Sequence, residues 1–218
     1  MTANVNGISL YYEKTGSGPA LILLHGNGED HHIFDCIAEK LSANFTVYAV
    51  DSRNHGGSQK TDVYDYEAMA GDIYGFITAL GLAPAYAAGF SDGAIVCLML
   101  AMRRAEALKK MALLGVNLKP SDFTEENIAF IRETYAQTGD PLFRLMLEQP
   151  NIGLDDVRGV TVPALIIGGE NDLFKPETFT NLAAALPNAE LMIMAGHEHD
   201  TYITGTDLLC ADFVRFFG

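Results

Sequence analysis

Apolar runs of strand length alternate with segments of helical period along most of this chain. Strands are expected at residues 8–13, 20–24, 45–50, 86–90, 110–114, 163–167 and 190–194. Helices are expected near residues 30–41, 69–80, 94–104, 177–186 and 207–217. Such an alternation builds a mostly parallel central sheet with helices on both faces. The sequence therefore predicts an α/β fold.

Length and composition favour one domain, residues 1–218. A chain of 218 residues is long enough for one well-buried core and short for two. Its 49% hydrophobic content and 21 dispersed glycines are typical of a globular protein rather than a disordered one. The formal net charge of −14 would repel nucleic acid and anionic membrane surfaces. A small-molecule substrate is the expected partner, and the sequence indicates no oligomeric state.

The cysteines and the first residues favour a reducing, cytoplasmic location. Cys36, Cys97 and Cys210 are widely spaced in apolar stretches. This suits buried free thiols better than disulfides or a zinc site. Residues 1–5 lack the basic region and apolar run of a secretory signal, and no stretch reaches the roughly 18 apolar residues of a membrane span.

One segment interrupts the alternation, about residues 118–160, where the sequence carries helical signals only. Asp122 and Glu125 resemble a capping box for a first helix, and Asp140-Pro141 opens a second. We expect an inserted small helical lid whose apolar side chains cover a substrate pocket. These side chains are Ile128, Ile131, Leu142, Leu145 and Met146.

The sequence Gly89-Phe90-Ser91-Asp92-Gly93 matches G-x-S-x-G between an expected short strand and an expected helix. A turn this tight strains the backbone of its central residue, and flanking glycines relieve the crowding of neighbouring chain. The Ser91 hydroxyl is then held out at the edge of the sheet. A glycine-rich strand-to-helix turn without function is the alternative, but the strand and helix on either side favour a nucleophile.

With this motif in place, the chain resembles a small bacterial α/β-hydrolase over essentially its full length. The resemblance implies a catalytic triad in the chain order serine, acid, histidine. Asp172 follows an apolar strand in Gly168-Gly169-Glu170-Asn171-Asp172, and the G-x-x-D pattern of the family selects it over Glu170. Its expected task is to orient the histidine and stabilise the imidazolium.

Two histidines compete for the role of base, because both follow the last expected strand. Many α/β-hydrolases read Gly-His here, which favours His197. Short members that resemble this chain read His, a small residue, Ser or Thr, then Tyr, which matches His199-Asp200-Thr201-Tyr202. We favour His199, whose added loop length gives the ring more reach toward Ser91, and His197 stays the alternative.

The oxyanion site is expected at the loop His25-Gly26-Asn27-Gly28, where small residues let backbone N–H groups approach a substrate oxygen. The resemblance implies the N–H of Asn27 as one donor. The second donor would be the N–H of Asp92, at the start of a helix whose dipole also favours an oxyanion.

Residues 51–58 resemble the D-x-R-G-x-G-x-S loop of the family, and we expect Asp51 to pair with Arg53 beside the site. His55 is a weak candidate for a substrate contact. A metal site formed by residues 197–200 with His31 and His32 is discounted, because the H-x-H pair lacks companion ligands at a recognisable spacing. His31 and His32 are interpreted as surface residues.

These features together predict a cofactor-free and metal-free serine hydrolase that cleaves small carboxylic esters through an acyl-enzyme. Two alternatives stay open. The same triad can act on amide, thioester or carbon–carbon bonds, or in perhydrolysis, and a non-catalytic ligand-binding module can keep the same fold.

Overall fold

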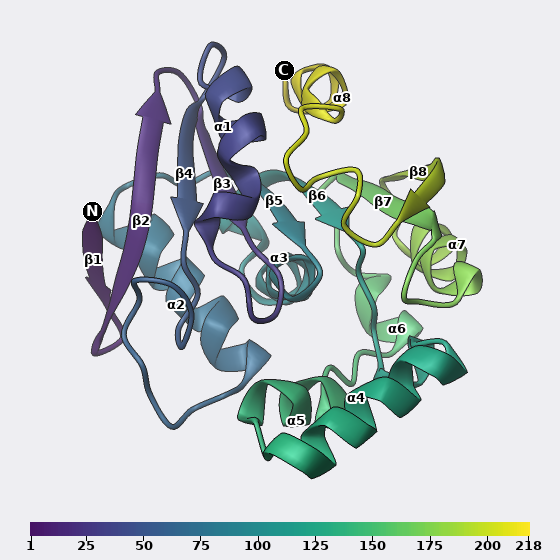
Figure 1. Ribbon diagram of the computed structural model, residues 1–218. Helices are drawn as coiled ribbons and strands as arrows, with labels where there is room; N and C mark the ends of the chain where they lie inside the picture. Colours follow the sequence, from purple (N-terminus) through teal and green to yellow (C-terminus); the bar gives the residue numbers. More distant parts are fainter.

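The computed structural model describes residues 1–218, and its centre is an eight-stranded sheet in the order β1-β2-β4-β3-β5-β6-β7-β8 (Figure 1). The strands are β1 (Thr2–Val5), β2 (Ile8–Gly16), β3 (Ala20–Leu24), β4 (Thr46–Val50), β5 (Ala85–Phe90), β6 (Leu108–Leu114), β7 (Ala164–Asn171) and β8 (Ala189–Glu198). The hairpin β1–β2 is antiparallel, and β2 pairs with β4 in the same way. The remaining neighbours, β4-β3-β5-β6-β7-β8, all pair in parallel. The predicted mostly parallel sheet is confirmed.

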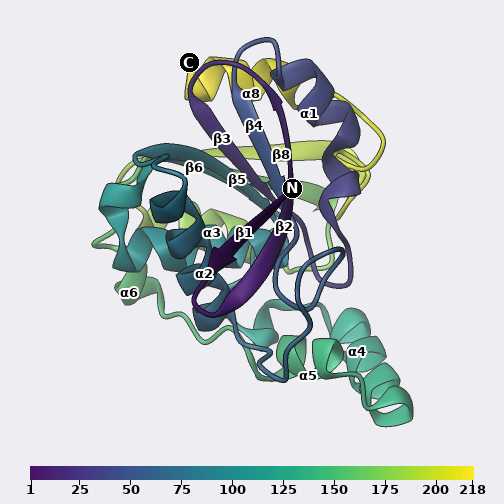
Figure 2. The ribbon, with the colours of Figure 1, turned by 90° about the vertical axis from the view of Figure 1, so that its left-hand side faces the viewer.

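Helices cover both faces of this sheet (Figure 2). One face packs against α1 (Asp35–Leu41) and α8 (Cys210–Phe217), with Phe34, Phe213 and Phe217 in its core. The other face packs against α2 (Tyr66–Ala79), α3 (Asp92–Arg103) and α7 (Pro176–Ala185). The central strands between these layers are apolar on both sides, as buried parallel strands are.

The observed elements differ from the predicted ones mainly at their ends. All seven expected strands and five expected helices are present, whereas β1, a four-residue edge strand, was not expected. The helix expected at 30–41 begins with a 3₁₀ turn at His31–Phe34, and only Asp35–Leu41 is α-helical. The strand expected at 190–194 extends through His197 to Glu198.

Residues between β6 and β7 form α4 (Glu125–Thr138), α5 (Pro141–Glu148) and a single turn α6 (Leu154–Val157). In Figures 1 and 2, α4 and α5 lie side by side beyond the end of the sheet. The capping prediction was wrong in detail. Thr124 caps α4 by accepting from the N–H of Asn127, whereas Asp122 accepts from Leu118 and Lys119 in the preceding turn.

The prediction of buried free thiols is fully confirmed only for Cys97. All three cysteines are free, but Cys36 is exposed and Cys210 is half-buried, so only Cys97 lies in the core. Burial raises the pKa of the Cys97 thiol to about 12. No helix in the structure combines the length and the hydropathy needed to cross a membrane.

Candidate active site

Ser91 stands in the turn between β5 and α3, with backbone angles φ 51° and ψ −114°. A non-glycine residue with such a positive φ is strained and needs support from its surroundings. The two glycines of the motif supply that space. A Cβ on Gly89 would lie 2.1 Å from the carbonyl oxygen of Gly93, and one on Gly93 would lie 2.1 Å from that of Leu24.

His199 and Asp172 meet although 27 residues separate them. The distance from His199 Nδ1 to Asp172 Oδ1 is 2.7 Å, and the side chains are 12% and 1% exposed. The backbone N–H groups of Gly169 and Phe174 donate to the carboxylate of Asp172 and hold it in place. Asp172 thus accepts a hydrogen bond from the Nδ1–H of the imidazole, which leaves Nε2 unprotonated when the ring is neutral.

Three residues that the sequence gave no reason to select fix the His199 ring. Its centroid lies 4.8 Å from that of Phe90 and 5.3 Å from that of Phe174. The ring also packs on Gly115, directly after β6, where a Cβ would lie 2.5 Å from His199 Cε1. Gly115 has φ 56°, so both the backbone and the ring require glycine here.

His197 lies within β8 and takes a different partner. Its Nδ1 is 3.1 Å from Thr201 Oγ1, and it makes no hydrogen bond to Asp172. The geometry therefore favours His199 over His197 as the partner of the acid.

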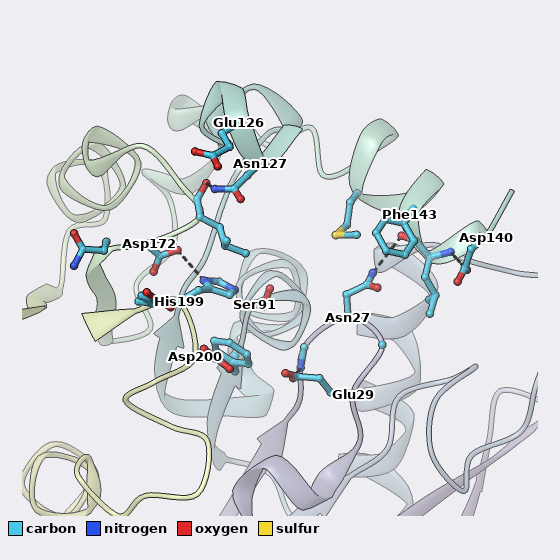
Figure 3. A pocket seen from close by; sticks show the side chains of 18 residues that line it. Asn27, Glu29, Ser91, Glu126, Asn127, Asp140, Phe143, Asp172, His199 and Asp200 are labelled. Carbon is cyan, nitrogen blue, oxygen red and sulfur yellow. Dashed lines mark hydrogen bonds and ion pairs between the residues drawn. The ribbon is translucent and has the colours of Figure 1, made fainter. Parts of the chain in front are cut away.

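Ser91 and His199 line the same cavity of about 600 Å³, into which both side chains point (Figure 3). Figure 3 shows His199 between Asp172 and Ser91, with a hydrogen bond on the Asp172 side. No hydrogen bond joins the Ser91 hydroxyl to His199 in this structure. In substrate-free enzymes this contact is often long and shortens on substrate binding.

The backbone N–H groups of Asn27 and Asp92 have no acceptor within the protein. The side chain of Asn27 donates to Asp92 Oδ2 at 2.9 Å, which ties the loop after β3 to the start of α3. Tyr66 donates its hydroxyl to Asp92 Oδ1 at 2.6 Å. By contrast, the N–H of Gly28 is occupied, because it donates to His55 Nε2 at 3.1 Å. The two free N–H groups are those expected for an oxyanion site.

His25 stabilises this loop from beneath. It is buried, its Nδ1 lies 2.7 Å from the Gly26 carbonyl oxygen, and its Nε2 accepts from the N–H of Ser52. Burial lowers the pKa of His25 to about 4. A neutral imidazole with its proton on Nδ1 satisfies both contacts.

Two expectations were wrong, the pairing of Asp51 with Arg53 in the loop after β4 and the exposure of His31. Arg53 pairs with Asp72 on α2 through two hydrogen bonds of 2.7 and 2.8 Å, not with Asp51. Asp51 instead accepts from the backbone and ring of His31, at 2.8 Å each. His31 is therefore buried rather than a surface residue, whereas His32 is exposed.

Two further expectations concern histidines, His55 as a substrate contact and His31 with His32 as parts of a metal site. His55 is buried, and Arg53 O and the N–H of Gly28 occupy its two ring nitrogens, so it does not face a substrate. Asp30, His31 and His32 place potential metal-ligating atoms within 4.8 Å of one another. That grouping includes neither histidine of residues 197–200, so the combined cluster considered from the sequence does not form.

Of the five apolar side chains expected to cover a pocket, two line the cavity. Leu142 and Met146, both on α5, line the cavity, and neighbouring Phe143 joins them. The other three side chains pack against or within the larger hydrophobic core instead; they are Ile128, Ile131 and Leu145.

Glu29 is a cavity residue that the sequence did not single out. Its Oε2 accepts from the N–H of Gly26 at 2.9 Å, so it bridges the loop that carries Asn27. Burial raises the pKa of Glu29 to about 7, and the nearby carboxylates of Asp200 and Asp92 add to this, while Gly26 and His199 oppose it. A carboxyl group near neutrality at a cleft is a frequent sign of a functional site.

This raised pKa predicts a pH-dependent stability. Between pH 4.5, the ordinary pKa of a glutamate, and about pH 7, Glu29 is protonated in the folded protein but ionised in the unfolded chain. Its contribution to the free energy of unfolding is therefore full below pH 4.5, falls as the pH rises to about 7, and is constant above. Urea unfolding at pH 4.5 to 8 should show wild type losing stability relative to Glu29→Gln across this window. Exposed Glu39→Gln is the control, and parallel curves for wild type and Glu29→Gln would contradict the prediction.

The sequence profile of the family described as alpha/beta hydrolase fold matches residues 19–144. The chain therefore belongs to the α/β-hydrolase fold family. That match contains the loop after β3 and Ser91, whereas Asp172 and His199 lie beyond it.

Relatives include proteins named as a hydrolase and as esterases. The chain is 33% identical over 113 residues to the uncharacterized hydrolase YraK of Bacillus subtilis, covering 50% of this chain and 42% of that protein. It is 29% identical over 145 residues to the pimeloyl-[acyl-carrier protein] methyl ester esterase of Chromobacterium violaceum, covering 65% and 56%. The matched part thus spans about half the length of these two relatives. The Vibrio atlanticus esterase of the same name is 25% identical and matched over 95% of this chain and 98% of its own.

Solved structures agree on the fold. The enol-lactonase of Burkholderia xenovorans LB400 superposes with a TM-score of 0.83 at 24% identity, covering 100% of this chain and 99% of the other. The carboxylesterase CesB of Bacillus subtilis gives a TM-score of 0.85 at 18% identity, covering 100% and 90%. At these identities the likeness establishes architecture alone.

Proposed function

We propose that this chain is a serine hydrolase that cleaves small carboxylic esters through an acyl-enzyme. The proposal depends above all on the 2.7 Å contact of His199 Nδ1 with Asp172 inside a cavity that Ser91 also lines. The esterases among its relatives support the same class of reaction.

The proposed mechanism assigns one task to each group. His199 Nε2 accepts the proton of the Ser91 hydroxyl as the oxygen attacks the ester carbonyl, and Asp172 stabilises the resulting imidazolium. The N–H groups of Asn27 and Asp92 hold the developing oxyanion. His199 then protonates the departing alcohol. Water activated by the same imidazole adds to the acyl-enzyme, and collapse of that intermediate releases the acid and restores Ser91.

In this proposal the α4–α5 pair acts as a small lid. Of the two lid helices, only α5 supplies apolar side chains to the cavity wall, namely Leu142, Phe143 and Met146. Five of the eighteen lining residues are hydrophobic, so the apolar surface available to an acyl chain is small. We therefore expect short acyl groups to fit best.

A series of p-nitrophenyl esters of increasing acyl length tests this expectation. The value of kcat/KM should peak at short acyl chains and fall as the chain outgrows the α5 surface, because further methylenes gain no burial and must displace water from the polar lining of the cavity. A preference for long acyl chains would contradict the assignment of the small pocket. Inactivity on the whole series, with Ser91 still labelled by a fluorophosphonate, would move the function to amide, thioester or carbon–carbon bonds. Absence of labelling would favour a non-catalytic binding module.

A further inference from the structure

The cavity in front of Ser91 is strongly acidic. Its lining contains no lysine and no arginine, and His199 is its one basic group. Six carboxyl groups line it: Glu29, Glu126, Asp140, Asp172, Glu198 and Asp200. Figure 3 shows such groups on several sides of the pocket, on the lid helices and on the loops below.

Protein partners satisfy only part of this charge. Asp172 is bound by His199, and Asp140 accepts from the N–H of Leu142 at the start of α5. The side chains of the remaining lid and loop carboxylates, Glu126, Glu198 and Asp200, have no hydrogen bond or ion pair within the protein. A substrate entering the cavity therefore meets carboxylates that no cationic side chain of the protein neutralises.

Glu29 brings this charge close to the reacting serine. A Cβ on Gly26 would lie 2.8 Å from Glu29 Oε2 and 3.1 Å from Ser91 Cβ. The Glu29 carboxyl and Ser91 therefore both lie next to Gly26, which has no side chain to separate them. Oε2 accepts from the N–H of Gly26, while Oε1 has no partner. The carboxyl is partly buried, and the groups acting on it are His199, Asp200 and Asp92.

An aromatic side chain completes the setting for a cation. Phe143, from α5, lines the cavity and is partly exposed within it. Aromatic faces attract ammonium groups, and quaternary ammonium ions are commonly bound by rings together with acidic residues. Ionised Glu29 is costly in a partly desolvated site, and a cationic ligand group would offset that cost.

We propose that the esters cleaved at this site carry a cationic group close to the scissile bond, and that Glu29 determines this specificity. The inference rests on the proposed serine-hydrolase function and narrows its substrate class. An uncharged ester remains a poorer substrate, and an anionic one is disfavoured.

Isosteric esters isolate the effect of charge from that of shape. The acetate esters of choline and of 3,3-dimethylbutanol differ in the alcohol only by nitrogen in place of carbon. The p-nitrophenyl esters of 4-(trimethylammonio)butanoate and 5,5-dimethylhexanoate place the same difference in the acyl group. At pH 8, where Glu29 is ionised, wild type should prefer the cationic member of at least one pair about tenfold in kcat/KM, as one partly desolvated charge contact with a ring allows.

Glu29→Gln is the decisive variant, because its amide oxygen can still accept from the N–H of Gly26 while the charge is removed. It should lower the cationic-to-neutral ratio about tenfold, toward one. Exposed Glu39→Gln, on α1, should leave the ratio as in wild type. An unchanged ratio in Glu29→Gln, or a wild-type preference for the neutral member of both pairs, would overturn the proposal.

A second measurement covers the case in which none of these esters turns over. Choline should slow fluorophosphonate labelling of Ser91 at lower concentrations than 3,3-dimethylbutanol does, and Glu29→Gln should remove the difference. Labelling that both compounds slow equally would reject the charge inference alone. A wild-type protein that is neither labelled nor active would instead reject the serine-hydrolase function on which the inference rests.

Discussion

Replacing Ser91 with alanine is expected to abolish hydrolysis, with turnover falling on the order of 10⁶-fold if the triad acts as a unit. The reason is that Ser91 Oγ supplies the attacking oxygen, and no other hydroxyl lines the cavity. Turnover of the best p-nitrophenyl ester and labelling by a fluorophosphonate measure the loss in two ways. Both signals should vanish in the variant.

The fold of Ser91→Ala should remain intact, because the Ser91 hydroxyl makes no hydrogen bond and alanine keeps the same Cβ in the strained turn. Circular dichroism and thermal unfolding check this point. Exposed Ser121→Ala serves as the matched control and should retain activity and labelling. A Ser91→Ala protein that keeps a large part of its activity would show that another group is the nucleophile.

Replacing His199 with alanine is expected to cost nearly as much as replacing Ser91, because the proton of the hydroxyl would then have no acceptor. His197→Ala should keep its activity within roughly a hundredfold, as expected for a residue that acts only by supporting the site. His197 contacts Thr201, not Asp172, so its loss leaves the acid and base in place. The measurement is kcat/KM for both variants on one ester.

Exposed His32→Ala is the control for removing a histidine, and it should be as active as wild type. The opposite order of effects, with His197→Ala inactive and His199→Ala active, would show that the base had been assigned to the wrong residue. Equal and small losses in both variants would count against any histidine base.

The sequence predicted the sheet well because its central strands are buried on both sides and so appear as continuous apolar runs. It also predicted the turn at Ser91, since G-x-S-x-G between a strand and a helix leaves few backbone solutions. The pairing of Asp172 with His199 followed from their position after parallel strands whose carboxyl ends meet at one edge. The catalytic roles of these residues remain predictions until the variants are measured.

Contacts between residues distant in sequence were not predictable in this way. Asp51 and Arg53 are only two positions apart, yet each pairs with a residue about twenty positions away, Asp51 with His31 and Arg53 with Asp72. Glu29 looks like an ordinary loop carboxylate until the fold places it beside Gly26 and Ser91. Gly115 is recognisable only when the His199 ring is seen against it. In all these cases the tertiary neighbour, not the local pattern, determines the role.

The position of β8 at the open edge of the sheet has a consequence for how the enzyme fails. β8 pairs with β7 alone, and its Leu191 and Ile193 are 38% and 44% exposed. The loop with His199 leaves this weakly covered strand, whereas Ser91 leaves β5 in the fully buried centre. Edge elements open at lower free energy than the core does. We therefore expect the strand and loop that carry His199 to open before the core does, so that activity is lost at a lower temperature or denaturant concentration than the fold of the whole domain.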